Sequence, residues 1–280
     1  MNIFEDTMSE MTYEQVENLV VQEAVVLLPI GIIEEHGPHL PLGTDIYLAY
    51  KQAHDVREEL NAMEIPCVIA PPFYLGGVQA LTRHFPGTFA FSEETIMACI
   101  EEYLENLDRF GFRRIVVFND HGDGLHISAI VEAIKNANRK LELQAYWMEY
   151  ELKEHGFSGE EDYILKLTTM PFEEMFQISK MPEDAFDVHA GAFETATMRE
   201  IYPEAVREDA LARLEPTFLQ GEQIGKWCNG AAEDKALIPK GYVGDPKGSR
   251  YIETNLKEAD RQIAMDIVNR FGQRRLKKCN

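Results

Sequence analysis

Near its N-terminal end the chain places two carboxylates and a histidine directly after an apolar run. The run VVLLPI leads into GIIEEHGPHLPLGTD, which contains Glu34, His36 and Asp45. Carboxylate and imidazole groups together are typical ligands of Zn²⁺, Mn²⁺ or Fe²⁺. Glu34 and His36 are one residue apart, so both can point the same way from an extended segment. The prolines and glycines from 37 to 43 can turn the chain and bring Asp45 beside them, and a carboxylate in the middle of such a site could bridge two metal ions.

A second stretch with the same chemistry is FNDHGDG, residues 118–124, which follows another apolar run. His121 and Asp123 repeat the one-residue separation of the first acid and histidine. Gly122 and Gly124 allow close approach of the backbone. Taken alone, either stretch could be a loop without chemistry, and Asp123 could simply cap a helix. Two acid and histidine loops that follow two strands favour a shared site over two unrelated loops.

His189 and Glu194 form a third candidate, in the segment DVHAGAFETATM. A histidine is suited to act as a general acid or base, because its unperturbed pKa lies near neutrality. The alternative is a helix N-terminus with Glu194 in its first turn. Two further residues could line a pocket. His84 lies beside the turn signal Pro86-Gly87 and could instead satisfy a loop carbonyl, whereas Trp147 lies in an apolar run and could instead belong to the core.

Strand and helix patterns alternate along the chain, so that these loops belong to one kind of architecture. Continuous apolar runs predict strands at 23–31, 65–72, 112–120 and 141–150. Apolar residues at helical spacing predict helices at 45–61, between an N-cap at Ser92 and a C-terminal Gly111, at 125–138 and at 255–271. This order predicts an α/β fold with a mainly parallel sheet and helices on both faces. In such folds ligands bind beyond the carboxyl ends of the strands, where the acid and histidine loops begin.

Composition excludes several classes of function. The 280 residues carry a net charge of −21, which disfavours binding to the phosphates of nucleic acids. No run of about 18 apolar residues predicts a membrane span, and the acidic N-terminus lacks a signal-peptide pattern. The four cysteines are scattered and form no disulfide framework. We therefore expect one cytoplasmic domain over residues 1–280, without a linker or an internal repeat.

The motifs together resemble the signature of the creatininase (creatinine amidohydrolase) family, whose first motif usually reads G-S-x-E-Q-H-G-P-H-L-P-x-x-T-D. The resemblance continues through FPGT at 85–88, N-x-H-G at 119–122 and HAG-x-x-ET at 189–195. It implies a three-layer α/β/α fold and a metal centre, commonly with two Zn, Mn or Fe ions. By position it makes Glu34, His36, Asp45 and His121 metal ligands, with Asp45 bridging, and His189 the catalytic histidine. It also implies a homo-oligomer, commonly a hexamer.

Departures from the family pattern leave one ligand open and alter the pocket. The usual loop N-G-H-G-G-N reads NDHGDG here. Asp123 stands where creatininase has a glutamate ligand, whereas other members have glycine there and use the glutamate that corresponds to Glu194. Asp123 and Glu194 are therefore both candidates for the fifth ligand. Asp120 replaces the usual glycine and Glu35 the usual glutamine, which disfavours creatinine itself as the substrate.

The resemblance implies hydrolysis, in which a metal-activated water attacks the carbonyl of a small, typically cyclic, amide. The family also includes enzymes that open a polyhydroxylated diketo ring by cleaving a C–C bond. The extra acids Asp120 and Asp123 suit hydrogen bonds to such a cyclitol-derived or carbohydrate-derived substrate. A third alternative is a homologue that binds metal or a small molecule without catalysis, which only the altered NDHGDG loop supports.

Overall fold

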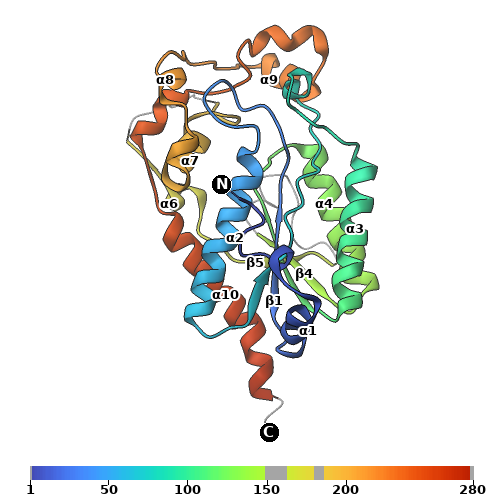
Figure 1. The fold of residues 1–280 in the computed structure, drawn as a ribbon. Helices are drawn as coiled ribbons and strands as arrows, with labels where there is room; N and C mark the ends of the chain where they lie inside the picture. The colour runs from blue at the N-terminus through green and yellow to red at the C-terminus, as the bar shows by residue number, and fades with distance from the viewer. Residues whose placement is uncertain (1, 149–162, 180–185, 278–280) are drawn as a thin grey trace.

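The computed structural model describes residues 2–148, 163–179 and 186–277 (Figure 1). Its centre is a sheet of five strands in the order β2-β1-β3-β4-β5, and every neighbouring pair is parallel. The strands are β1 (Val25–Ile30), β2 (Cys67–Ile69), β3 (Arg114–Asn119), β4 (Gln144–Met148) and β5 (Leu165–Leu167). The predicted parallel sheet is confirmed. The last two residues of the strand expected at 141–150 lie outside the described residues.

Helices cover both faces of this sheet, so that the expected three-layer α/β/α fold is confirmed. One layer contains α2 (Thr44–Ala62) and α10 (Leu256–Lys277), and the other contains α3 (Glu93–Phe110) and α4 (Gly124–Lys140) (Figure 1). The smaller elements include β6 (Phe176–Ile178) and β7 (Ile252–Thr254), which pair antiparallel. The remaining described helices are α1 (Tyr13–Val21), α6 (Phe172–Met175), α7 (Ala192–Ile201), α8 (Glu208–Leu211) and α9 (Glu222–Asn229), with 3-10 turns η1 (Met8–Glu10), η2 (Leu81–His84), η3 (Pro203–Ala205), η4 (Ala232–Leu237) and η5 (Pro246–Tyr251).

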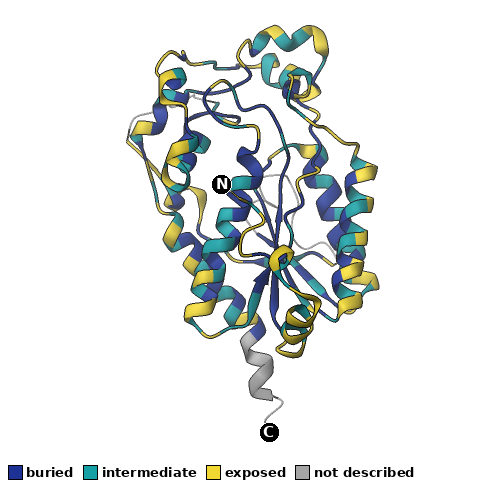
Figure 2. Ribbon diagram, in the orientation of Figure 1, coloured by how far each residue is buried: buried dark blue, intermediate teal, exposed yellow. Residues whose placement is uncertain are grey.

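Local sequence explains the main element boundaries. All six residues of β1 are buried, as expected for a strand covered on both faces (Figure 2). The side chain of Ser92 accepts the Thr95 N–H and starts α3, and Gly111 ends that helix with a φ of 107°. The helices are buried along one side and exposed along the other (Figure 2). Among the described helices, none is long and apolar enough to cross a membrane.

The register of the two central strands decides where the acid and histidine loops meet. Ile30, the last residue of β1, pairs with Asn119, the last residue of β3. The chain therefore leaves both strands at the same level of the sheet. A Cβ at Gly31 would lie 2.8 Å from the backbone nitrogen of Ile46, so glycine allows the start of α2 to pack against the exit of β1. This close approach brings the first turn of α2 to the same place.

Candidate metal centre and its cavity

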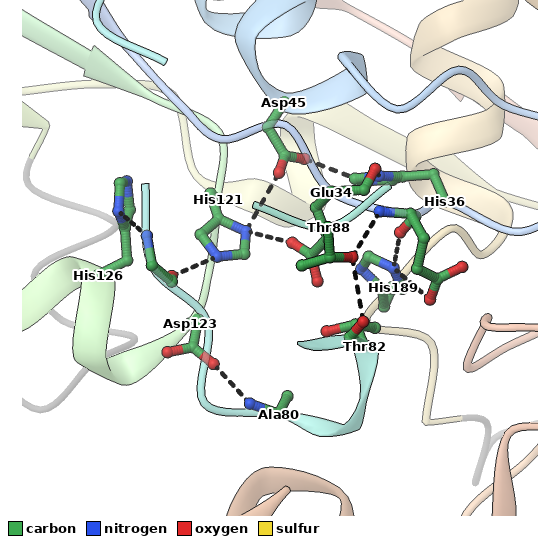
Figure 3. A network of polar contacts seen from close by, with 12 residues as sticks. Glu34, His36, Asp45, Ala80, Thr82, Thr88, His121, Asp123, His126 and His189 are labelled. Carbon is green, nitrogen blue, oxygen red and sulfur yellow. Dashed lines mark hydrogen bonds and ion pairs between the residues drawn. The ribbon is translucent and has the colours of Figure 1, made fainter. Parts of the chain in front are cut away.

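Glu34, His36 and Asp45 converge at the carboxyl end of β1, and each is at most 1% exposed (Figure 3). The loop folds back on itself, because the backbone N–H of Glu34 donates to the carbonyl of Leu42 over 2.8 Å. Asp45 lies in the first turn of α2. The positive end of the helix dipole favours a carboxylate at that position. The turn of prolines and glycines thus produces the convergence that the spacing predicted.

Asp45 lies between two imidazole rings that come from different loops (Figure 3). Its Oδ1 is 2.9 Å from His36 Nε2, and its Oδ2 is 3.2 Å from His121 Nδ1. Glu34 Oε2 is 3.1 Å from the same nitrogen of His121. The loops after β1 and β3 therefore share a single cluster, in which Asp45 is the central group.

Backbone carbonyls fix the proton on one nitrogen of each ring in the cluster. Each of three histidines donates from one ring nitrogen to a carbonyl oxygen: His36 Nδ1 to Glu34 (3.0 Å), His121 Nε2 to Gly77 (3.1 Å) and His189 Nε2 to Glu35 (2.8 Å). A carbonyl can only accept, so the opposite nitrogen of each neutral ring carries a lone pair. Hydrogen bonding of this kind orients the histidine ligands of metal sites.

The ligand atoms fall into two groups of three. One contains Glu34, Asp45 and His121, and the other contains His36, His189 and Glu194; within each group the atoms lie within 4.8 Å of one another. Glu194 Oε2 is 3.6 Å from His36 Nε2, and it also accepts the N–H of Ala190 over 2.6 Å.

Three buried atoms of these groups, Glu34 Oε2, His36 Nε2 and Asp45 Oδ2, form no hydrogen bond. Buried polar atoms are rarely left without a partner. Short contacts of these atoms, which make no hydrogen bond, fit divalent cations bound among them.

The electrostatics of the cluster favour positive charge between its members. Burial lowers the pKa of His36, but Asp45 outweighs it and raises that pKa to about 10. Burial likewise opposes the charge on His121, and Glu34 and Asp45 raise its pKa to about 9. Burial raises the pKa of Asp45, yet His36 and His121 hold it below its ordinary range. The carboxylates that attract these protons would also attract a divalent cation.

Asp123 lies apart from both ligand groups, although it follows His121 by only two residues. Its Oδ1 accepts the Leu125 N–H over 2.9 Å and caps α4. Its Oδ2 accepts the backbone N–H groups of Gln79 and Ala80 over 2.9 and 3.1 Å (Figure 3). The carboxylate therefore holds the chain before η2 against the start of α4, and both oxygens are occupied.

The three residues expected to contact substrate lie in different surroundings. Asp120 lines a cavity beside the metal-ligand groups, and burial with nearby Asp45 raises its pKa to about 7. His84 forms a hydrogen bond to a loop carbonyl, because its Nε2 lies 2.7 Å from the carbonyl oxygen of Gly230. Trp147 is 1% exposed and belongs to the main hydrophobic core. Of the three, only Asp120 is part of the cavity wall.

The cavity has a volume of about 940 Å³, and His121, His189 and Glu194 contribute to its wall. A space of this size accepts a small organic molecule. Other residues of the wall come from α2, α7 and α10, and three of them are phenylalanines. These lining residues are Lys51, Gln52, Asp55, Phe172, Phe176, Phe193, Glu200, Lys257 and Asp260. The metal-ligand groups therefore open into a chamber built mainly by helices.

Several residues that support the site were not predicted. The N–H of Glu35 donates to the hydroxyl oxygen of Thr88 over 3.1 Å, and that hydroxyl donates to the carbonyl of Thr82, which fixes the loop after β1 (Figure 3). Asn119 holds the second loop, because its side chain donates to the His121 carbonyl and contacts the His126 ring nitrogen over 3.0 Å. The FPGT motif, which ends at Thr88, was the available signal for the first support.

The family model described as creatinine amidohydrolase matches residues 9–252. The chain belongs to the creatininase family. A solved creatininase mutant superposes with a TM-score of 0.68 at 23% identity, over 95% of this chain and 98% of that one, which shows a common fold. The family identity predicted from the motifs is confirmed.

Relatives within the creatininase family carry out different reactions by name. A creatinine amidohydrolase of Pseudomonas putida is 27% identical over 217 residues, 74% of this chain and 76% of that protein. A mycofactocin precursor peptide peptidase of Mycobacterium ulcerans is 27% identical over 260 residues, 89% and 84% of the two chains. A 3-dehydro-scyllo-inosose hydrolase of Thermotoga maritima is 23% identical over 283 residues, 93% and 83%. Membership of the family therefore leaves the substrate open.

Proposed function

We propose that this protein is a metal-dependent hydrolase that cleaves the C–N bond of a small amide. The observation that carries the proposal is the pair of three-residue ligand groups, joined through Asp45, at the edge of a cavity of about 940 Å³. Two of the relatives described above are an amidohydrolase and a peptidase by name, and both kinds of enzyme cleave amide bonds. A cyclic amide is the leading substrate, as the resemblance implied.

Five side chains are proposed to hold two divalent ions. Glu34 and His121 would bind one ion, His36 and Glu194 the other, and Asp45 both. We assign the fifth position to Glu194 over Asp123, because both oxygens of Asp123 already accept backbone N–H groups. Divalent ions in such a site supply Lewis acidity, which lowers the pKa of water and polarises a carbonyl.

His189 is the proposed proton donor to the leaving nitrogen. Its ring lies beside that of His36, with 4.5 Å between centroids, and it forms part of the cavity wall. The Glu35 carbonyl accepts from its Nε2, and a second contact of 3.6 Å joins that nitrogen to Glu35 Oε1. These contacts fix the orientation of the ring and leave Nδ1 for the exchange of a proton. Proton transfer by a positioned histidine contributes roughly 10²–10⁴-fold to a rate.

The test combines metal content with a substrate panel. The protein is purified without chelator, and zinc, manganese and iron per chain are measured by plasma mass spectrometry. Metal-loaded protein is then incubated with creatinine, cyclic imides, formamides and dipeptides, and release of amine is followed. We expect about two ions per chain and turnover of at least one amide. Protein that takes up no metal after soaking with Zn²⁺, Mn²⁺ or Fe²⁺ would overturn the proposal.

The second candidate is a hydrolase that opens a cyclic diketone by cleaving a C–C bond. It is favoured by Asp120, whose carboxylate lines the cavity without a hydrogen bond from the described residues and is free to bind a hydroxyl group. A relative is named as a hydrolase of a dehydrogenated inosose, which is a cyclitol derivative. Turnover of a cyclitol-derived diketone, with no turnover of the amide panel by the same metal-loaded sample, would select this reaction.

A further inference from the structure

Asp260 is a buried carboxylate in the cavity wall that the metal centre does not use. It lies on α10, is 5% exposed, and lines the same cavity as His121 and His189. Within the part of the chain that the structure describes, no hydrogen bond or ion pair reaches its side chain. Its neighbours one and two turns along the helix, such as Ile263 and Ile267, are fully buried in the core. Burial of an unpaired carboxylate is unfavourable, so its position calls for a partner.

The side chains around Asp260 are mainly negatively charged, and few positive charges offset them. The charged groups that act on it or lie beside it come from every neighbouring element: Lys51 and Asp55 from α2, Asp120 from the loop after β3, Glu200 from α7, and Lys257 from α10 itself. Lys51 is already bound to Asp55. Lys257 is exposed, and its amine contacts no described carboxylate. Burial, then Asp55, raises the pKa of Asp260 to about 8, which Lys51 only partly opposes.

Two other features of the same wall match a positively charged organic group. Gln52, on α2, lines the cavity and leaves its Oε1 buried without a hydrogen bond, so the wall contains a second acceptor without a donor. Phe172, Phe176 and Phe193 pack together with centroids 4.8 to 5.3 Å apart and line the cavity. An ammonium group offers three donors and is attracted to aromatic faces. A third metal site is not indicated, because the compact ligand groups among the described residues are the two of the metal centre.

We propose that Asp260 and Gln52 form a subsite for a protonated amine of the substrate. The inference rests on the proposed amide hydrolysis and deepens it: the substrate is an amide that carries a basic nitrogen remote from the scissile bond. The continuous helix α2 sets the separation. Lys51 and Asp55, which act on Asp260, follow Asp45 by six and ten residues, or roughly 9 to 15 Å along the helix axis. Several bonds therefore separate the amine from the amide.

The test uses a matched pair of probes that need no catalysis. Binding of 2-phenylethylammonium and of neutral 2-phenylethanol to the metal-loaded protein is measured by titration calorimetry at pH 8.5, above the raised pKa of Asp260. The variants are Asp260→Asn, which removes the charge but keeps the shape, and the control Glu258→Gln. Glu258 lies on the same helix, is not part of the cavity wall, and contacts Arg261. We expect the ammonium probe to bind at least tenfold more tightly than the alcohol, and Asp260→Asn to remove most of this difference.

The outcomes separate the subsite from the proposed function. Equal binding of the two probes to the wild type, or an unchanged preference in Asp260→Asn, overturns the subsite even if amides are hydrolysed. A preference that is lost only in Asp260→Asn, with metal content unchanged, supports it even if no amide in the panel is cleaved. Loss of the preference in Glu258→Gln as well overturns it, because the effect would then reflect net charge. Thermal denaturation of each variant verifies that it is folded.

Discussion

Two parts of the cavity wall are built on different principles. At the metal centre the rings of His36, His121 and His189 are each fixed by a carbonyl, and the acids lie within ion-pair distance of them. At the helical wall, the part of the cavity lined by α2 and α10, Asp260 has no partner among the described residues, and Gln52 has a buried oxygen without a donor. We propose that the first part holds cations within the protein. We propose that a ligand completes the second part, so the two parts should respond differently to the same kind of substitution.

The strongest contrast should come from Asp45→Asn. Asp45 contacts both His36 and His121, so loss of its charge weakens both proposed ion sites. We expect metal content to fall from about two ions per chain to below one. Amide hydrolysis should fall on the order of a thousandfold, because Lewis-acid stabilisation is worth several kcal/mol. Plasma mass spectrometry and initial rates measure the two effects, and a variant with both ions still bound would show that Asp45 is not the bridge.

The next largest effect distinguishes two roles for His189. It falls in one ligand group by geometry, yet we propose that it donates a proton. If it donates a proton, His189→Asn should retain both ions while kcat falls roughly 10²–10⁴-fold, with little change in KM. If it is a ligand, the same variant should lose metal in proportion to activity. Metal content and kcat measured on one preparation decide between these roles.

A smaller and more selective effect separates Glu194 from Asp123. Glu194→Gln should reduce the metal content to about one ion per chain, because this carboxylate lies 3.6 Å from His36 Nε2. Asp123→Ala should keep both ions and instead lose the cap of α4 and the contacts to residues 79 and 80. The free energy of unfolding of Asp123→Ala should fall by about 1 kcal/mol, which should lower its Tm by about 2 to 4 °C. Metal loss in Asp123→Ala at an unchanged Tm would reverse the assignment.

This contrast also explains what the sequence could predict. The segment from the loop after β1 to the first turn of α2 holds three proposed ligands within twelve residues, so local spacing and turn residues were sufficient to anticipate their convergence. Spacing could not decide between Asp123 and Glu194, because the groups that occupy Asp123 come from residues 79 and 80, more than 40 positions earlier. The aromatic side chain of Trp147 suited both a pocket and a core, and only the fold places it in the core.

Some missed features did have signals. Thr12 and Gln15 form a capping box that starts α1, and this four-residue spacing is visible in the sequence. Asp260 shares the apolar side of α10 with Ile263 and Ile267, so a charge stands at a core position of an amphipathic pattern. The strands β5, β6 and β7 have only three residues each, too few for a period to be recognised.

The homo-oligomer, with a hexamer implied by the resemblance, stays a prediction that sedimentation can test.

The smallest expected effect is a change in the thermal stability of the protein when Asp260, in the helical wall, is replaced. Burial raises the pKa of Asp260 to about 8, so the folded protein holds this proton more tightly than the unfolded chain does. Asp260 therefore favours the folded state most at low pH, and its contribution declines as pH rises through about 8. Asp260→Asn removes the group that must ionise, and it should raise Tm by a few degrees at pH 8.5 and by less at pH 5.

Scanning calorimetry at the two pH values measures this effect, and Glu258→Gln is again the control. Glu258 is only half-buried and is paired with Arg261, so its loss should change Tm little at either pH. A saturating cation in the wild type should likewise raise Tm at pH 8.5, because it pairs with the carboxylate, lowers the pKa of Asp260 and binds only the folded protein. If Asp260→Asn lowers Tm at pH 8.5, then the side chain has a structural partner, and the wall is complete without a ligand.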